Sequence, residues 1–139
     1  MRASCGAQAA ALVTNWRTSV AGNATLVEAG DSRILIDAGL SPRSLAERLR
    51  SSGVDPSSLT VVLLSHEHND HARGAVPFSR KWGVPLAGTR GTYAAAGIGA
   101  ETLTGFEVLV PDEARDFGPL SVRGVSLPHD AAAPLAFVV

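Results

Sequence analysis

Short apolar runs alternate with amphipathic segments along this chain, a pattern typical of a domain that combines strands and helices. Residues 61–64 form a continuous apolar run, so the strand predicted at residues 59–64 should be buried on both faces. Residues 25–28 and 33–37 predict two strands joined by a hairpin turn, because the intervening Ala-Gly-Asp-Ser has a turn composition. Further strands are expected at residues 84–87, 107–110, 120–126 and 135–139.

A helix is predicted over residues 42–52, with Ser41 as its N-cap and a proline at its first position. Leu45 and Leu49 fall on one face of this helix and should pack against the sheet. Shorter helices are expected at residues 77–82 and 91–96. The pattern therefore predicts an α+β fold with one mixed β-sheet that carries helices on one face.

The segment after the 59–64 strand holds three of the four histidines of the chain, as Ser-His-Glu-His-Asn-Asp-His. His66 and His68 should point to the same side, because side chains alternate along an extended strand. Asp70 and His71 follow in a turn, since Asn-Asp favours turns and helix N-caps. Imidazole and carboxylate groups are ligands for zinc, manganese or iron.

Four such groups on one short turn are too crowded for a single tetrahedral ion, so two adjacent ions are expected. His66 and His68 would bind the first ion, and Asp70 and His71 the second. Two-metal sites are a recurrent device for hydrolysing phosphoesters and acyl groups. The alternative is that these are ordinary structural or surface histidines. His129, at the end of a later apolar run, is either a further ligand or a surface residue at a strand end.

Residues 22–28, 34–39 and 65–74 together resemble the metallo-β-lactamase-fold superfamily. Within it, the chain is most similar to the small bacterial hydrolases of the exonuclease or phosphodiesterase branch. The cues for this branch are Gly-Asn-Ala-Thr ahead of a strand, His-Ala-Arg-Gly after the motif, and the later His-Asp-Ala. The resemblance implies an αββα sandwich.

The resemblance also implies roles for individual residues. His66, His68 and His129 would bind one metal ion, while Asp70 and His71 would bind the second. A bridging water or hydroxide would attack the substrate, and Asp70 would orient that water as a catalytic residue. Asp37 matches a family aspartate that supports loop geometry, although a turn or cap role explains an Asp before Ala-Gly equally well.

One departure from the family concerns its second half. In the family that half supplies one further histidine and a carboxylate that bridges the two metals. After His129 the only acidic residue here is Asp130, and neighbouring residues on a strand point to opposite faces. The chain is therefore expected to be the N-terminal half of the sandwich: a fragment, a truncated gene product or a half that needs another chain. An apolar sheet face should then remain uncovered, so self-association or a complementary C-terminal half is expected.

Composition is that of one globular domain, with 139 residues and a formal net charge of −1. We expect an N-terminal extension at residues 1–18 and the truncated domain at residues 19–139. The single cysteine, Cys5, cannot form an internal disulfide, which is consistent with a reducing compartment. No apolar run is long enough to cross a membrane. A cytoplasmic protein is therefore expected. Four cations close to the motif in sequence could meet phosphates, or could simply form a solvated helix face: Arg73, Arg80, Lys81 and Arg90.

These observations lead to two functional hypotheses. The first is a metal-dependent hydrolase of the phosphodiesterase or nuclease type, which uses a metal-activated water and Zn²⁺ (or Mn²⁺ or iron), with up to two ions in a complete site. The second is a catalytically incomplete metal-binding half-domain that is a fragment or needs a complementary chain. A phosphodiester or nucleic-acid substrate is expected in the first case, and no membrane partner in either.

Overall fold

The computed structural model describes residues 12–17, 22–98, 105–127 and 135–139. Its larger sheet has six strands in the order β1-β2-β3-β4-β5-β6. The first three strands are antiparallel and the last four, from β3 onwards, are parallel, so the sheet is mixed as predicted. These strands are β1 (Leu12–Arg17), β2 (Asn23–Ala29), β3 (Ser32–Ile36), β4 (Val61–Leu63), β5 (Leu86–Gly88) and β6 (Phe106–Val108).

Local sequence signals account for most of these elements. The β2–β3 hairpin turns at Gly30, whose φ of 55° suits a residue without a Cβ. The helix α1 (Pro42–Ser51) begins where predicted, with the hydroxyl of Ser41 accepting a hydrogen bond from the amide of Ser44. The helix α3 (Ala75–Trp82) begins two residues earlier than predicted and ends at the predicted Gly83.

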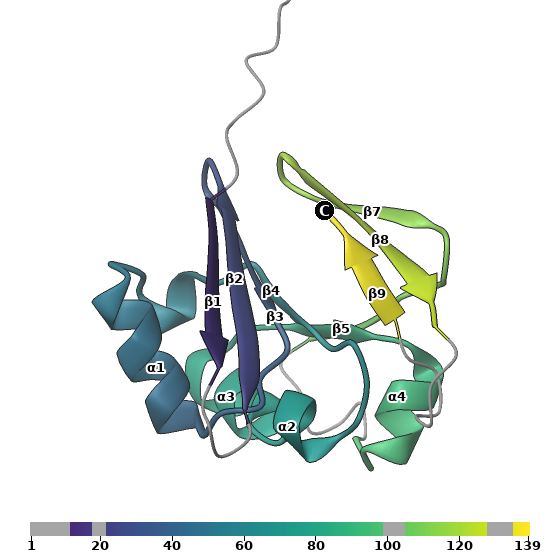
Figure 1. Cartoon of the computed structure of the whole chain (residues 1–139), viewed down its shortest axis with the longest axis horizontal. Coiled ribbons are helices and arrows are strands. Elements are labelled where there is room, and N and C mark those ends of the chain that lie inside the picture. The colour runs from purple at the N-terminus through teal and green to yellow at the C-terminus, as the bar shows by residue number, and fades with distance from the viewer. Residues whose placement is uncertain (1–11, 18–21, 99–104, 128–134) are drawn as a thin grey trace, which may run out of the picture.

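The helices cover one face of the six-stranded sheet (Figure 1). Besides α1 and α3 they are the 3₁₀ turn η1 (Pro56–Ser58), α2 (Asn69–Ala72) and α4 (Arg90–Ala95). Phe78 of α3 and Leu45 and Leu49 of α1 are fully buried against Leu26 and Leu35 of the sheet. Burying side chains of this size stabilises the fold by about 1.5–3 kcal/mol each.

A second, smaller sheet covers the other face, which the sequence analysis expected to be left open. Its strands are β7 (Ala114–Phe117), β8 (Leu120–Ser126) and β9 (Leu135–Val138), in that order. Phe117 and Leu120 form one core with Ile34, Val61 and Leu63 of the larger sheet. The expectation of an uncovered apolar sheet face is therefore wrong for this sheet, because the hairpin that contains β7 was not recognised in the sequence.

The outer face of the smaller sheet bears Ser121, Arg123 and Asp116, all exposed, and no helix covers it in the described part of the chain. The structure thus has a helix layer and two sheet layers. The strand β1 lies within residues 1–18, the range expected to be an extension, and pairs with β2 along its whole length. That domain boundary remains a prediction. Among the residues that the structure describes, no helix is both long and apolar enough to cross a membrane.

Candidate metal centre

The three motif histidines come together just beyond the end of β4. His66 and His68 lie on the loop that follows the strand, and His71 lies in α2, whose first turn is closed by hydrogen bonds from the amides of His71 and Ala72 to the carbonyl of His68. The ring centroids of His66 and His68 are 4.8 Å apart, and those of His66 and His71 are 4.0 Å apart. The predicted clustering of these three imidazoles is therefore present in the fold.

Asp37 links this cluster to the neighbouring strand β3. Its carboxylate accepts hydrogen bonds from the amide of Ser65 at 2.8 Å and from the hydroxyl of Ser65 at 2.7 Å. The same carboxylate lies 2.7 Å from Nδ1 of His71. Asp37 is only 6% exposed, so these bonds form largely away from water, where they are stronger.

These contacts determine which ring nitrogens carry protons. Nδ1 of His71 must donate, because the Asp37 carboxylate can only accept. The Ser65 hydroxyl likewise donates to Asp37, so it accepts from Nδ1 of His66, which lies 2.8 Å away. Nε2 is then the unprotonated ring nitrogen of both His66 and His71, the tautomer that metal-binding histidines adopt when a carboxylate orients them.

Backbone hydrogen bonds hold Asp37 in an unusual conformation. Its φ is 65°, in the left-handed region that Asp and Asn tolerate better than most residues. Its amide donates to the carbonyl of Leu63, and the next amide, of Ala38, donates to the carbonyl of His71, both at 2.7 Å. The left-handed turn thus aims the carboxylate at the motif loop. This agrees with the loop-supporting role suggested for Asp37.

Two residues of this site were not singled out in the sequence analysis. Ser65 bridges Asp37 and His66, and the side-chain amide of Asn23 lies 3.2 Å from Nε2 of His71. Both stand in segments that carry the family resemblance, Ser65 at the start of the motif stretch and Asn23 in the Gly-Asn-Ala-Thr cue, but neither was given a role there. The Asn23 amide donates to Nε2 of His71, the nitrogen that would bind a metal. His71 would therefore give up this hydrogen bond when it binds a metal ion.

Two predicted ligands, Asp70 and His129, have side chains outside the described part of the structure. The backbone of Asp70 belongs to α2, but its side chain is outside the described atoms, and His129 and Asp130 lie outside the described residues. Among the side chains that are described, no three His, Cys, Asp or Glu groups are already arranged as metal ligands. The imidazole donors and their Asp37 support nevertheless fit a divalent transition metal by chemistry. The start of β9 also reaches the motif loop, because the amide of Leu135 donates to the carbonyl of Ser65 at 2.8 Å.

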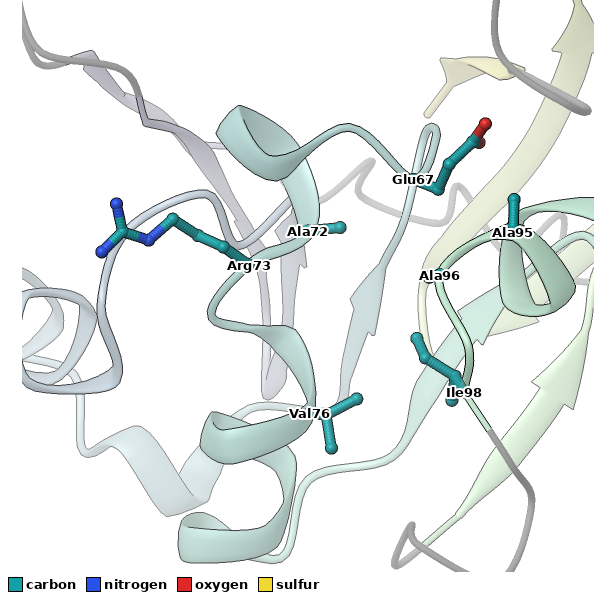
Figure 2. Close-up of a pocket in the computed structure, with 7 residues that line it drawn as sticks. All are labelled: Glu67, Ala72, Arg73, Val76, Ala95, Ala96 and Ile98. Carbon is teal, nitrogen blue, oxygen red and sulfur yellow. The ribbon is translucent and has the colours of Figure 1, made fainter.

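A pocket of about 350 Å³ opens beside the motif loop, between α3 and α4 (Figure 2). Glu67, which stands between the two loop histidines in the sequence, borders it, so the pocket adjoins the motif loop. The other lining residues are Ala72, Arg73, Val76, Ala95, Ala96 and Ile98.

Comparison with known proteins places this arrangement in a family. A sequence model of the Metallo-beta-lactamase superfamily matches residues 17–133. The exodeoxyribonuclease WalJ of Streptococcus pneumoniae is 28% identical over 117 residues, which cover 81% of this chain and 44% of that protein. The exodeoxyribonuclease YycJ of Bacillus anthracis is 26% identical over 118 residues, covering 84% of this chain and 45% of that protein. The chain thus spans less than half the length of these relatives.

Solved structures agree on the fold. The subclass B3 metallo-β-lactamase MEM-A1, from a soil metagenome library, superposes with a TM-score of 0.75 at 22% identity over 91% of this chain and 53% of that one. The Rm3 metallo-β-lactamase gives a TM-score of 0.72 at 17% identity over 84% of this chain and 49% of that one. Together with the family match over most of the sequence, these likenesses show that the chain belongs to the metallo-β-lactamase superfamily.

Proposed function

We propose that this chain provides the metal-binding half of a hydrolase that cleaves phosphodiester bonds in nucleic acid. The observation that carries the proposal is the convergence of His66, His68 and His71, two of them oriented by the buried carboxylate of Asp37. A purely structural histidine cluster would not need a shared carboxylate that keeps Nε2 unprotonated in two of its members. The relatives named as exodeoxyribonucleases support a nucleic-acid substrate.

The proposed ligands are those that the motif suggests. His66, His68 and His129 would hold the first ion, and Asp70 and His71 the second, with zinc preferred over manganese or iron because imidazoles predominate. The contact of Leu135 with Ser65 supports a role for His129, since it ties the chain six residues after that histidine to the motif loop. A divalent ion bound here would lower the pKa of a water molecule and polarise the phosphate ester.

This chain's own residues have two further roles in the proposal. Asp70 would orient the attacking water, and Asp37, acting through Ser65 and His71, would keep the imidazoles in the ligating tautomer. Asp37 is thus a positioning residue, since it touches the ligands rather than the substrate. The lone cysteine is consistent with a cytoplasmic location, which we propose for the protein.

A second candidate function is that of a metal-binding half-domain which becomes active only with a complementary chain or segment. The observation in its favour is that the chain covers 44–45% of the two exodeoxyribonucleases. The second metal site would then have only Asp70 and His71. Two dications about 3.5–4 Å apart repel strongly unless a bridging carboxylate offsets their charge.

Metal analysis after extensive dialysis of the zinc-loaded chain tests both candidates. We expect one retained equivalent of zinc, a second that is weak, and slow hydrolysis of bis-p-nitrophenyl phosphate. His68→Ala should release the retained zinc, whereas Arg123→Ala, on the exposed face of β8, should retain it. Two retained equivalents with turnover abolished by His68→Ala would favour a chain that hydrolyses phosphodiesters by itself over one that needs a complement. No retained metal in the wild-type chain would overturn both.

A further inference from the structure

Positive charge is concentrated on the helix layer. The whole chain has 12 Lys and Arg against 13 Asp and Glu, yet residues 71–100 contain no acidic residue. This acid-free segment includes α3 and α4 and carries four cations, which are Arg73, Arg80, Lys81 and Arg90. A near-neutral protein thus presents a local basic surface, the form of charge asymmetry that attracts polyanions.

Three of these cations lie at the two ends of α3, with Arg73 just before its first turn and Arg80 and Lys81 in its last turn. Arg73 stands two residues after His71, and its side chain extends out of the neighbouring pocket, away from Ala95 and Ile98 (Figure 2). Arg80 and Lys81 are exposed near the other end of α3, whose eight residues span about 12 Å. The opposite side of α3 is buried in the core, so Arg80 and Lys81 lie on its outward side.

A fourth cation joins this row from α1, which packs beside α3 (Figure 1). The guanidinium of Arg50 lies 5.2 Å from the ring centroid of Trp82, and the ammonium of Lys81 lies 5.3 Å from the same centroid. Cation–π attraction therefore holds two like charges beside one indole ring. Neither cation forms an ion pair with any described residue, although the exposed Asp55 carboxylate acts electrostatically on Arg50 from a longer distance. We call Arg50, Arg73, Arg80 and Lys81 the basic strip.

Helix geometry alone explains part of this strip. Arg50, Arg80 and Lys81 lie in the last turns of their helices, where cations stabilise the carbonyl end of the helix dipole. That effect explains neither the lack of acidic residues over residues 71–100 nor the presence of Arg73 beside the motif, before α3 begins. The two cations at the Trp82 ring also repel each other, which an anion placed between them would relieve.

We propose that the basic strip binds the phosphate backbone of a nucleic-acid strand whose end lies at the histidine cluster. The inference rests on the proposed function for its substrate and adds the path that the strand takes: from the cluster past Arg73, along α3, to the cations at Trp82. Phosphates at regular intervals match a row of cations, and such contacts are independent of base sequence. Trp82 orients Arg50 and Lys81 rather than stacking on a base.

Binding of a fluorescein-labelled oligothymidylate, followed by fluorescence anisotropy in EDTA, tests the strip without any hydrolysis. The double variant Arg50→Gln/Lys81→Gln should bind about tenfold more weakly near 50 mM salt, and its slope of log K against log salt should fall by about 1.4, which is 0.7 for each lost phosphate contact. Arg123→Gln removes one charge from the distant β8 and should bind like the wild type. A strand with a neutral methylphosphonate backbone should bind the wild type poorly.

An unchanged affinity and salt slope in the double variant, with its circular dichroism like that of the wild type, would overturn the proposal. So would tighter binding of poly-glutamate than of DNA with equal charge, because the strip would then serve an acidic protein. The test of the strip can fail independently of the proposed function. If the double variant loses DNA binding while the wild-type chain retains no metal, the strip is supported and the hydrolase is rejected. If the wild-type chain hydrolyses its substrate while the double variant binds DNA as the wild type does, the hydrolase is supported and the strip is rejected.

Discussion

Replacing Asp37 by Asn removes the negative charge that organises the histidine cluster while it keeps the side-chain shape. The left-handed φ of 65° is tolerated by Asn, so the backbone should remain in place. The Asn oxygen can still accept from the Ser65 amide, but the Asn NH₂ group would face Nδ1 of His71 and the hydroxyl of Ser65. His71 would then have to move its proton to Nε2, the nitrogen that faces the amide of Asn23.

The expected loss follows from the bonds that change. Hydrogen bonds to a charged group contribute about 1.5–3 kcal/mol each, and two of them lose their charged acceptor in a site that is 6% exposed. Because the two bonds are coupled through one carboxylate, we expect a fall of about 3 kcal/mol in the free energy of unfolding rather than the full sum. Zinc affinity should fall about 10–100-fold, as is common when the carboxylate behind a ligating histidine is removed.

Urea denaturation followed by circular dichroism measures the first effect, and competition with a chromophoric chelator measures the second. Asp116→Asn is a matched control, since it removes the same charge from an exposed position on β7 and should change neither quantity. Asp37→Ala should be less stable than Asp37→Asn by about 1–2 kcal/mol, because Ala does not tolerate the left-handed backbone. An Asp37→Asn variant within about 0.5 kcal/mol of the wild type, with zinc affinity unchanged, would refute this account of the site.

Two further predictions concern the packing around the site. Gly74→Ala should lower the free energy of unfolding by at least about 2 kcal/mol, because the added Cβ would collide with the backbone carbonyl of Leu40. Thermal melting should show this loss. An unchanged melting temperature would contradict the close approach of Gly74 to Leu40. Tyr93→Phe removes the hydrogen bond of 2.8 Å from the phenol to the carbonyl of Glu107, which ties α4 to β6, and should cost about 0.5–1.5 kcal/mol. Burial raises the pKa of the Tyr93 phenol, so a spectroscopic alkaline titration should show Tyr93 ionising only when the protein unfolds.

Prediction from the sequence succeeded where the determining interactions are local. The turn at Gly30, the N-cap at Ser41 and the end of α3 at Gly83 each depend on residues within a few positions of one another. The spacing of the motif histidines likewise placed His66 and His68 side by side, and their ring centroids are 4.8 Å apart. Family membership followed from the same short motifs.

Tertiary structure alone decided how the cluster is held and how the sheet is covered. Asp37 meets Ser65 across 28 residues and His71 across 34, and Asn23 meets His71 across 48, so no local pattern specifies these bonds. The second sheet covers Ile34 and Leu63 through residues more than fifty positions later, and Arg50 and Lys81 meet only where α1 packs on α3. Periodicity and capping determine which elements form, whereas contacts between distant residues arise only when those elements bury their apolar faces together.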